Sequence, residues 1–335
     1  MFRWLLALIG LVAVVVVGGY FVLKRPDIPY ETLAVTYESP ASRYVDLPGG
    51  VHMHYRVDGA PGDAPTLLLI HGFSDAVQTW EPWVRQLNDL SANGYRIISI
   101  DLPGHGLTRA PAGYRASINA FRDAVYAFAQ SQHLTHFAIA GNSMGGNVAW
   151  EYALAHPDQL TGLILVDSAG WSHPTDEGAL NSPMMKLLRS PVGPYLRDLD
   201  NTALFRRGVQ AAFADPAHAS EEMVTRFVTL SRAPGHRDIL LQMQTNRNAR
   251  RAASNEVLAP ITTPTLILWG DQDHLIPVGD AELFHTAIHG SEVKIYHNVG
   301  HMPQNEATEQ SASDVHEFLY RIVEGSALAP GQAVE

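Results

Sequence analysis

The residues best suited to chemistry lie at positions 139–147, which read Ile-Ala-Gly-Asn-Ser-Met-Gly-Gly-Asn. This stretch contains Gly141-x-Ser143-x-Gly145, between a short apolar segment and a segment that can form a helix. A serine on a sharp turn from strand to helix is lifted clear of a sheet, and small flanking residues let the backbones approach closely. Because so short a pattern also occurs by chance, the interpretation of Ser143 as a nucleophile depends on partners elsewhere in the chain.

Two later loops supply the partners that a serine nucleophile needs. A serine hydroxyl is a weak nucleophile unless a base removes its proton and a carboxylate holds that base in the right tautomer. The expected strand at 292–297 leads to His301, the candidate base. The expected strand at 265–269 leads to Asp271 and Asp273, either of which could be the acid. Serine, acid and histidine thus occur in that order, each after a strand.

An attacked carbonyl also needs two N–H donors for the oxyanion that forms on it. The residue after the nucleophile, Met144, is expected to supply one of them. The loop after the expected strand at 66–70 points to Phe73 for the other. The helix that begins behind the turn directs its N-terminal N–H groups toward the same place.

The elements that position these residues alternate between strand and helix, which predicts a doubly wound, mostly parallel α/β sheet. Apolar runs without alternation indicate strands covered on both faces. Strands at 43–47 and 51–57, joined by Pro-Gly-Gly, indicate a preceding hairpin in which His52 and His54 are expected to be solvated. Further strands are expected at 66–70, 96–100, 137–140, 162–166, 265–269 and 292–297, with helices at 77–90, 117–133, 148–156, 278–288 and 310–323.

The pattern divides the chain into segments. We expect a membrane anchor at 1–25, a linker at 26–41, an α/β core at 42–170 and 259–323, an inserted helical cap at 171–258 and a flexible tail at 324–335. Residues 4–23 carry no charge and would span about 30 Å as a helix, enough to cross a bilayer. This predicts a single-pass anchor in preference to a cleaved signal peptide or a core helix. Basic residues flank both ends, so the side of the membrane is not indicated.

Composition narrows the classes of function. The chain has 335 residues, 46% of them hydrophobic, which allows one large α/β domain with an insertion. Its net charge of −11, without a dense Lys/Arg run, argues against nucleic acid as a partner. The absence of cysteine excludes disulfides and a thiol nucleophile. The sixteen histidines show no His-Glu-x-x-His spacing, so we expect no metal and no cofactor. The sequence does not indicate the oligomeric state.

Short glycine-containing motifs at the strand ends resemble those of the α/β-hydrolase superfamily. They are His71-Gly72-Phe73, Asp101-x-Pro103-Gly104-x-Gly106, Gly141-Asn142-Ser143-Met144-Gly145-Gly146, Leu165-Val166-Asp167-Ser168-Ala169-Gly170, Gly270-x-x-Asp273-x-x-x-Pro277 and Gly300-His301. Together they cover residues 42–323. Within the superfamily the chain is most similar to membrane-anchored monoacylglycerol lipases and to bacterial lipases with the same serine turn. The resemblance implies Asp273 as the acid and leaves Asp271 as a turn residue.

These observations predict a serine carboxylic-ester hydrolase, an esterase or lipase that works through an acyl-enzyme intermediate on small ester or lipid substrates. A carbon–carbon hydrolase of ring-cleavage products is one alternative, because such enzymes use a similar serine turn. A non-catalytic ligand-binding protein on the same fold is another. Dehalogenases and epoxide hydrolases usually have aspartate where this chain has Ser143, and the sequence argues against them.

Overall fold

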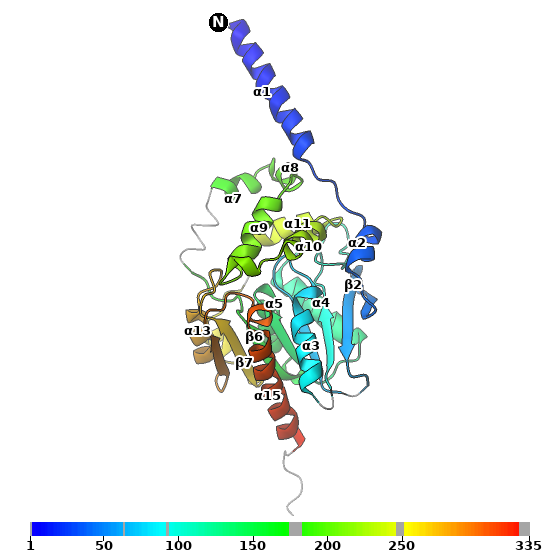
Figure 1. Ribbon diagram of the computed structural model, residues 1–335, viewed down its shortest axis with the longest axis vertical. Coiled ribbons are helices and arrows are strands. Elements are labelled where there is room, and N and C mark those ends of the chain that lie inside the picture. The colour runs from blue at the N-terminus through cyan, green and yellow to red at the C-terminus, as the bar shows by residue number, and fades with distance from the viewer. Residues whose placement is uncertain (1, 63, 92–93, 174–182, 246–250, 328–335) are drawn as a thin grey trace, which may run out of the picture.

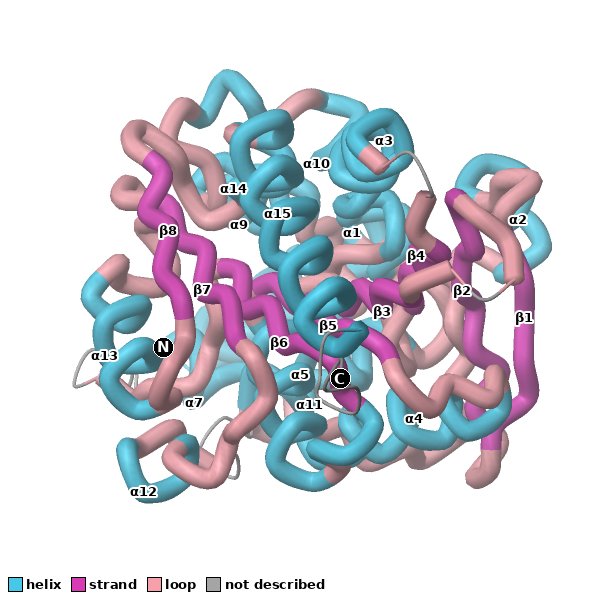
Figure 2. Tube along the Cα trace, turned by 90° about the horizontal axis from the view of Figure 1, so that it is seen from below, coloured by secondary structure: helices cyan, strands magenta, loops and turns pink. Residues whose placement is uncertain are grey.

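The computed structural model describes residues 2–62, 64–91, 94–173, 183–245 and 251–327. One eight-stranded sheet lies at the centre, in the order β1-β2-β4-β3-β5-β6-β7-β8 (Figures 1 and 2). The second strand pairs antiparallel with both neighbours, and all the other pairs are parallel. The strands are β1 (Ser42–Leu47), β2 (Val51–Gly59), β3 (Thr66–Ile70), β4 (Arg96–Ile100), β5 (Phe137–Asn142), β6 (Leu160–Val166), β7 (Thr265–Gly270) and β8 (Glu292–Tyr296).

The sheet is covered by helices on both faces, as the apolar central strands predict. In β3, Leu68 and Ile70 face one core cluster, and Leu67 and Leu69 face the other. Helices α4 (Ile118–Ser131), α5 (Met144–Ala155) and α13 (Gly279–Ala287) pack into the first cluster. Helices α3 (Glu81–Leu90) and α15 (Thr308–Ala327) pack into the second, on the opposite side of the sheet (Figure 2). Burial on both faces explains why these strands show no polar alternation.

The parallel strands β3, β5, β6, β7 and β8 all end at one edge of the sheet, so the loops that follow them lie together. The helices inserted between β6 and β7 lie over this edge (Figure 1). They are α7 (Pro183–Leu188), α8 (Gly193–Arg197), α9 (Thr202–Ala211), α10 (Glu221–Ser231) and α11 (His236–Thr245). The last inserted helix, α12 (Asn255–Leu258), packs beside α13. The predicted hairpin, parallel sheet and helical insertion are therefore present.

Two segments differ from expectation. The expected linker at 26–41 includes helix α2 (Tyr30–Tyr37), in which Tyr30 and Leu33 are buried. The Tyr30 hydroxyl lies 2.9 Å from His236 Nε2 in the cap, so this short segment is held by tertiary contacts that its sequence does not reveal. Helix α15 continues to Ala327, into the expected tail at 324–335. The rest of that tail, 328–335, lies outside the described residues.

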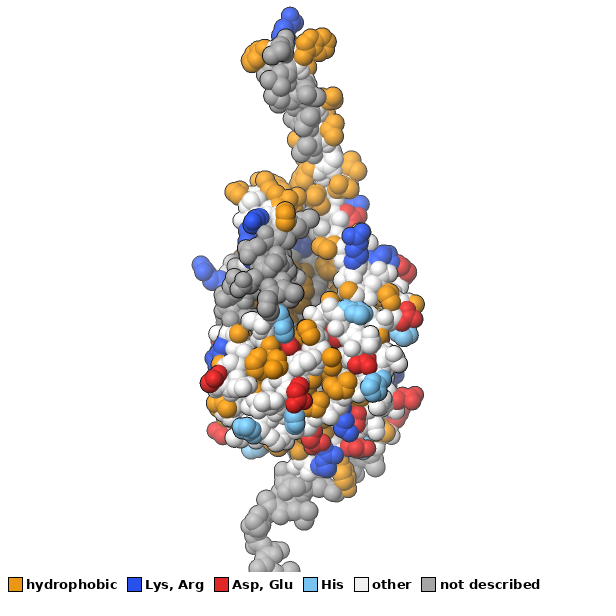
Figure 3. Space-filling view, turned by 90° about the vertical axis from the view of Figure 1, so that its left-hand side faces the viewer, with side chains coloured by type: hydrophobic (Ala, Val, Ile, Leu, Met, Phe, Trp, Pro, Cys, Tyr) orange, Lys and Arg blue, Asp and Glu red, His pale blue; other side chains and the backbone are white. Residues whose placement is uncertain are grey.

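The first helix, α1 (Phe2–Leu23), projects from the cap end of the body (Figures 1 and 3). Its helical conformation agrees with the sequence. Across the described part of the chain, no helix has both the length and the apolar character needed to span a membrane. The single-pass anchor predicted at residues 4–23 is therefore not confirmed. After the helix, Lys24 forms a β-bridge with Leu199, and Arg25 pairs with Asp200 at 2.9 Å.

The contrast between α1 and α2 gives a stability prediction. Deleting residues 1–22 should leave the free energy of unfolding nearly unchanged, because the described side chains there are largely exposed. Deleting 1–37 also removes the buried Tyr30 and Leu33 and should cost about 3–5 kcal/mol, as for loss of large core side chains. Urea unfolding of both truncations measures the difference. Equal stability of the two proteins would show that α2 does not support the fold.

Candidate active site

The turn between β5 and α5 holds Ser143 in a strained conformation. Its φ of 57° and ψ of −119° are unusual for a residue other than glycine, and such strain typically costs about 1–3 kcal/mol. A Cβ on Gly141 would overlap the carbonyl oxygen of Gly145, and a Cβ on Gly145 would overlap that of Ile70. Both glycines are therefore required by the close approach of backbones, as the sequence predicts. The Ser143 N–H donates to Val166 O at 3.0 Å, which fixes the turn on β6.

The candidate base and acid are in contact. His301 Nδ1 lies 2.7 Å from Asp273 Oδ2, and both side chains are buried. The other carboxylate oxygen accepts N–H groups from Leu275 at 2.7 Å and Ile276 at 3.0 Å. Burial disfavours the charge, but His301 and these amides outweigh it and hold the pKa of Asp273 below its usual value. A carboxylate at Nδ1 leaves Nε2 available to accept a proton from a hydroxyl.

The neighbouring aspartate has a different environment. Asp271 pairs with the exposed His297 at 2.9 Å, and its second oxygen accepts the Asn298 N–H at 2.7 Å. It therefore stabilises the turn after β8, the role that the resemblance implied. Of the two aspartates that the sequence left as candidate acids, the structure places Asp273 beside His301.

The loop that carries His301 packs directly on the serine turn. The side chain of Asn142, which precedes Ser143, donates to the carbonyl oxygen of His301 at 3.0 Å. Among the described residues, no hydrogen bond joins the Ser143 hydroxyl to the His301 ring. Catalytic hydrogen bonds often tighten only when a substrate binds, so this geometry is compatible with Ser143 and His301 acting as a pair. Ser143 is partly exposed and can be reached from outside the core.

The two expected oxyanion donors belong to segments that flank Ser143. Met144 is the first residue of α5, so its N–H lies at the helix N-terminus. A Cβ built on Gly72 would lie 3.2 Å from Ser143 Cβ, which places the loop after β3 against the serine. Phe73 follows Gly72 in that loop. The arrangement is compatible with N–H groups on both sides of a carbonyl bound at Ser143.

The loop with Phe73 is held from two sides. His71 Nε2 accepts the Leu102 N–H at 3.0 Å, which ties the loop to the segment after β4. Asp75 pairs with Arg226 of the cap at 3.4 Å, and both side chains are largely buried. The cap therefore contacts the predicted oxyanion loop through an ion pair.

The cap is also joined to the His301 loop. The His301 N–H donates to Ala212 O in the cap at 2.8 Å. Glu306 accepts the Gly300 N–H at 3.0 Å and the Ala214 N–H at 3.1 Å, one from each segment. Burial raises the pKa of Glu306, although the two N–H groups oppose the rise. The position of the candidate base is thus set jointly by the core and the cap.

One sequence prediction at the edge of this region is wrong. His54 is fully buried, whereas a solvated side chain was expected. Its Nδ1 lies 2.7 Å from Asp101 Oδ2, and its Nε2 lies 2.9 Å from Ser42 Oγ. The residue after β4 (Asp101), Ser42 of β1 and the Tyr44 ring, whose centroid lies 5.1 Å away, enclose this imidazole, so the alternation in β2 does not report solvent exposure. His52 itself is partly exposed and pairs with Asp46.

The buried His54–Asp101 pair predicts acid sensitivity. Burial opposes ionisation of Asp101, but the hydrogen bond and charge of His54 prevail and lower its pKa from 3.8 to about 2. A carboxyl group whose pKa is lower in the folded than in the unfolded protein stabilises the fold at any pH above its unfolded-state pKa. This stabilisation is lost as the pH falls from about 4 to about 2. The loss should be about 2 kcal/mol. Unfolding free energies of the wild type and Asp101→Asn across this range measure it; parallel curves would contradict the assignment.

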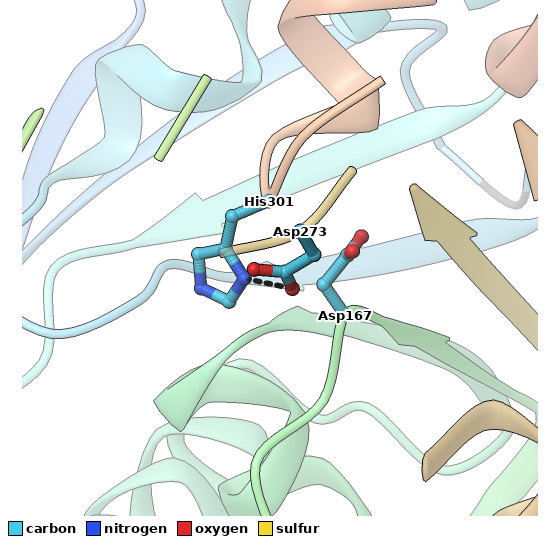
Figure 4. A group of neighbouring side chains, drawn as sticks. All are labelled: Asp167, Asp273 and His301. Carbon is cyan, nitrogen blue, oxygen red and sulfur yellow. Dashed lines mark hydrogen bonds and ion pairs between the residues drawn. The ribbon is translucent and has the colours of Figure 1, made fainter. Parts of the chain in front are cut away.

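Sequence reasoning gave no role to Asp167, the residue after β6. The structure places its carboxylate with Asp273 and His301, with one O or N atom from each side chain within 4.8 Å of the others (Figure 4). The signal that could have found it is its position, since it follows a parallel strand as Ser143, Asp273 and His301 do. We interpret the group as an acid–base cluster, because His301 Nδ1 and Asp273 Oδ2 lie at hydrogen-bond distance, 2.7 Å.

Comparison with known proteins defines the class. A family model described as the alpha/beta hydrolase fold matches residues 65–308, and the chain belongs to this family. Lipase 1 of Psychrobacter immobilis is 31% identical over 286 residues, covering 81% of this chain and 82% of the relative. Monoacylglycerol lipase abhd6-B of Xenopus laevis is 27% identical over 284 residues, covering 81% of this chain and 80% of the relative.

Solved structures agree with this membership. The crystal structure of a membrane phospholipase A matches with a TM-score of 0.69 and 26% identity, covering 96% of this chain and 99% of that one. A meta-cleavage product hydrolase matches with a TM-score of 0.70 but 21% identity, covering 84% and 98%, which shows the shared fold alone. The resemblance to lipases that the sequence motifs indicated is therefore confirmed.

Proposed function

We propose that this carboxylic ester hydrolase cleaves acylglycerol-like lipid esters by means of Ser143, His301 and Asp273. The observation that carries the proposal is the buried 2.7 Å contact between His301 and Asp273, in a loop that packs on the strained Ser143 turn. The names of the lipase relatives favour a lipid ester as substrate. The alternative, carbon–carbon bond hydrolysis, is supported by solved structures such as the meta-cleavage product hydrolase, whose 21% identity shows a shared fold alone.

In the proposed reaction, His301 Nε2 accepts the Ser143 proton as the hydroxyl oxygen attacks the ester carbonyl. The N–H groups of Phe73 and Met144 stabilise the resulting oxyanion. Collapse of the tetrahedral intermediate expels the alcohol, which takes its proton from His301, and leaves an acyl-enzyme. A water molecule then loses a proton to His301 and attacks the acyl group, releasing the acid and restoring Ser143. Asp273 keeps the imidazole in the required tautomer throughout.

The triad proposal predicts a specific pattern of loss. Ser143→Ala and His301→Ala should each lower kcat for a short p-nitrophenyl ester by about 10³-fold or more, because each removes a group on which the others depend. His297→Ala is the matched control, since His297 is an exposed histidine paired with the other aspartate of the same region. Its rate should stay within about twofold of wild type. Thermal unfolding checks that each variant folds, and wild-type rates in Ser143→Ala would rule out the proposed nucleophile.

We propose further that α1 holds the enzyme at a lipid surface. Its side chains Phe2, Trp4, Leu11, Val14, Val15, Val17, Phe21 and Val22 are each more than half exposed. Figure 3 shows apolar side chains along this helix beyond the globular body. An exposed apolar helix of this kind favours contact with lipid. The similarity to a membrane phospholipase A supports the same placement.

Vesicle binding tests this placement separately from the chemistry. Full-length protein should sediment with phosphatidylcholine vesicles, and the protein lacking residues 1–22 should remain in the supernatant, because the exposed apolar helix is gone. Hydrolysis of a short water-soluble ester should be the same in both proteins, within about twofold. Equal sedimentation of the two proteins would show that α1 is not the membrane contact.

A further inference from the structure

The cluster beside the proposed catalytic site contains one more acid than the reaction uses. Asp167 is fully buried and comes from the loop after β6, whereas Asp273 comes from the loop after β7 (Figure 4). The Asp167 backbone is fixed, because its N–H donates to Leu268 O at 2.9 Å. Its φ of 43° lies in the left-handed region, which aspartate and asparagine tolerate better than most residues.

The two carboxyl groups have unequal support for a negative charge. Asp273 has His301 on one oxygen and two N–H donors on the other. Asp167 has a single donor, the Gly270 N–H at 3.0 Å on Oδ1, and its buried Oδ2 has no hydrogen-bond partner among the described residues. Two carboxylates this close in a buried site cannot both remain ionised without a large cost. The proton should therefore reside on the less supported group.

We propose that Asp167 is a neutral carboxylic acid whose O–H donates a hydrogen bond to Asp273 and fixes the orientation of that carboxylate. This gives the orphaned oxygen of Asp167 a partner and removes the repulsion between the two groups. Asp167 is then a positioning residue that acts on His301 through Asp273. The inference rests on the function proposed above, since it assumes that Asp273 is the acid of the triad.

The surrounding charges favour the same assignment. Burial raises the pKa of Asp167 well above its usual value, and the charge of Asp273 raises it further. The negative charge of Glu306, which lies in the segment after His301, also raises the pKa of Asp167. The remaining titratable groups of the cluster are His301, whose ring faces Asp273, and Tyr296, whose own pKa is raised mainly by burial. Within the described cluster, His301 is thus the group able to carry positive charge, and it contacts Asp273.

Two substitutions separate a hydrogen-bond role from a packing role. Asp167→Asn keeps the shape, tolerates the positive φ, and can still accept from Gly270 N–H while its amide donates to Asp273. Asp167→Gly also accepts the φ but removes the donor. Ester hydrolysis should fall about 10–100-fold in kcat, with little change in KM, for Asp167→Gly, since a hydrogen bond to a charged group is lost. Asp167→Asn, which keeps a hydrogen-bond donor, should retain most of the wild-type kcat.

A measurement independent of turnover keeps the inference falsifiable if Asp167→Gly folds poorly. The His301 ring should titrate at the same pH in wild type and in Asp167→Asn when followed by NMR, because a neutral group replaces a neutral group. If Asp167 is instead ionised in the wild type, the substitution removes a negative charge and lowers the His301 pKa by about one unit. That shift, or wild-type kcat in a folded Asp167→Gly, would overturn the inference.

Infrared difference spectra between wild type and Asp167→Asn at neutral pH provide the second readout. They should contain a carboxylic-acid C=O band that the substitution removes, and its absence would also overturn the inference. Failure of the proposed function gives a different result, because Ser143→Ala would then retain activity. The NMR and infrared experiments would still report where the proton of Asp167 resides.

Discussion

The close approach of backbones at the serine turn is the constraint on which the site depends. The start of α5 passes so near the end of β3 that a methyl group on Gly145 would overlap the Ile70 carbonyl. This contact forces the chain into the strained geometry at Ser143 and directs the first turn of α5 toward the same space. The strain is offset by the packed sheet, in which β5 lies between β3 and β6 with every residue buried. A rigid sheet thus holds an otherwise unfavourable conformation.

The acid side of the site follows a related principle. Parallel strands bring residues that are distant in sequence to one edge, so Asp167, Asp273 and His301 meet although three different loops carry them. In such a buried cluster the number of N–H donors decides which oxygen carries charge, because little water is present to solvate it. Asp273 has the greater number of donors and the histidine. The charge distribution is therefore determined by backbone geometry as much as by residue type.

The features predictable from the sequence are those with a local signature. Strand alternation, the Gly-x-Ser-x-Gly turn and the order of serine, acid and histidine all appear in short windows. The contact between Asp273 and His301 followed from that order together with the family resemblance. The burial of His54 and the docking of α2 could not be predicted in this way. Each depends on contacts with a segment that is far away in the chain. The position of Asp167 gave a signal, but its protonation depends on neighbours that only the folded chain assembles.

The hydrogen bonds between the cap and the His301 loop limit how the cap of such an enzyme can be exchanged for another. Ala212 and Ala214 make these contacts through main-chain atoms, so the backbone path between α9 and the following short helix must be kept whatever side chains it carries. A foreign cap grafted onto this sheet would have to reproduce that path, or the imidazole would lose its main-chain support. Changes in substrate range are therefore easiest on the outer helices, where new side chains do not disturb the junction that the two parts share.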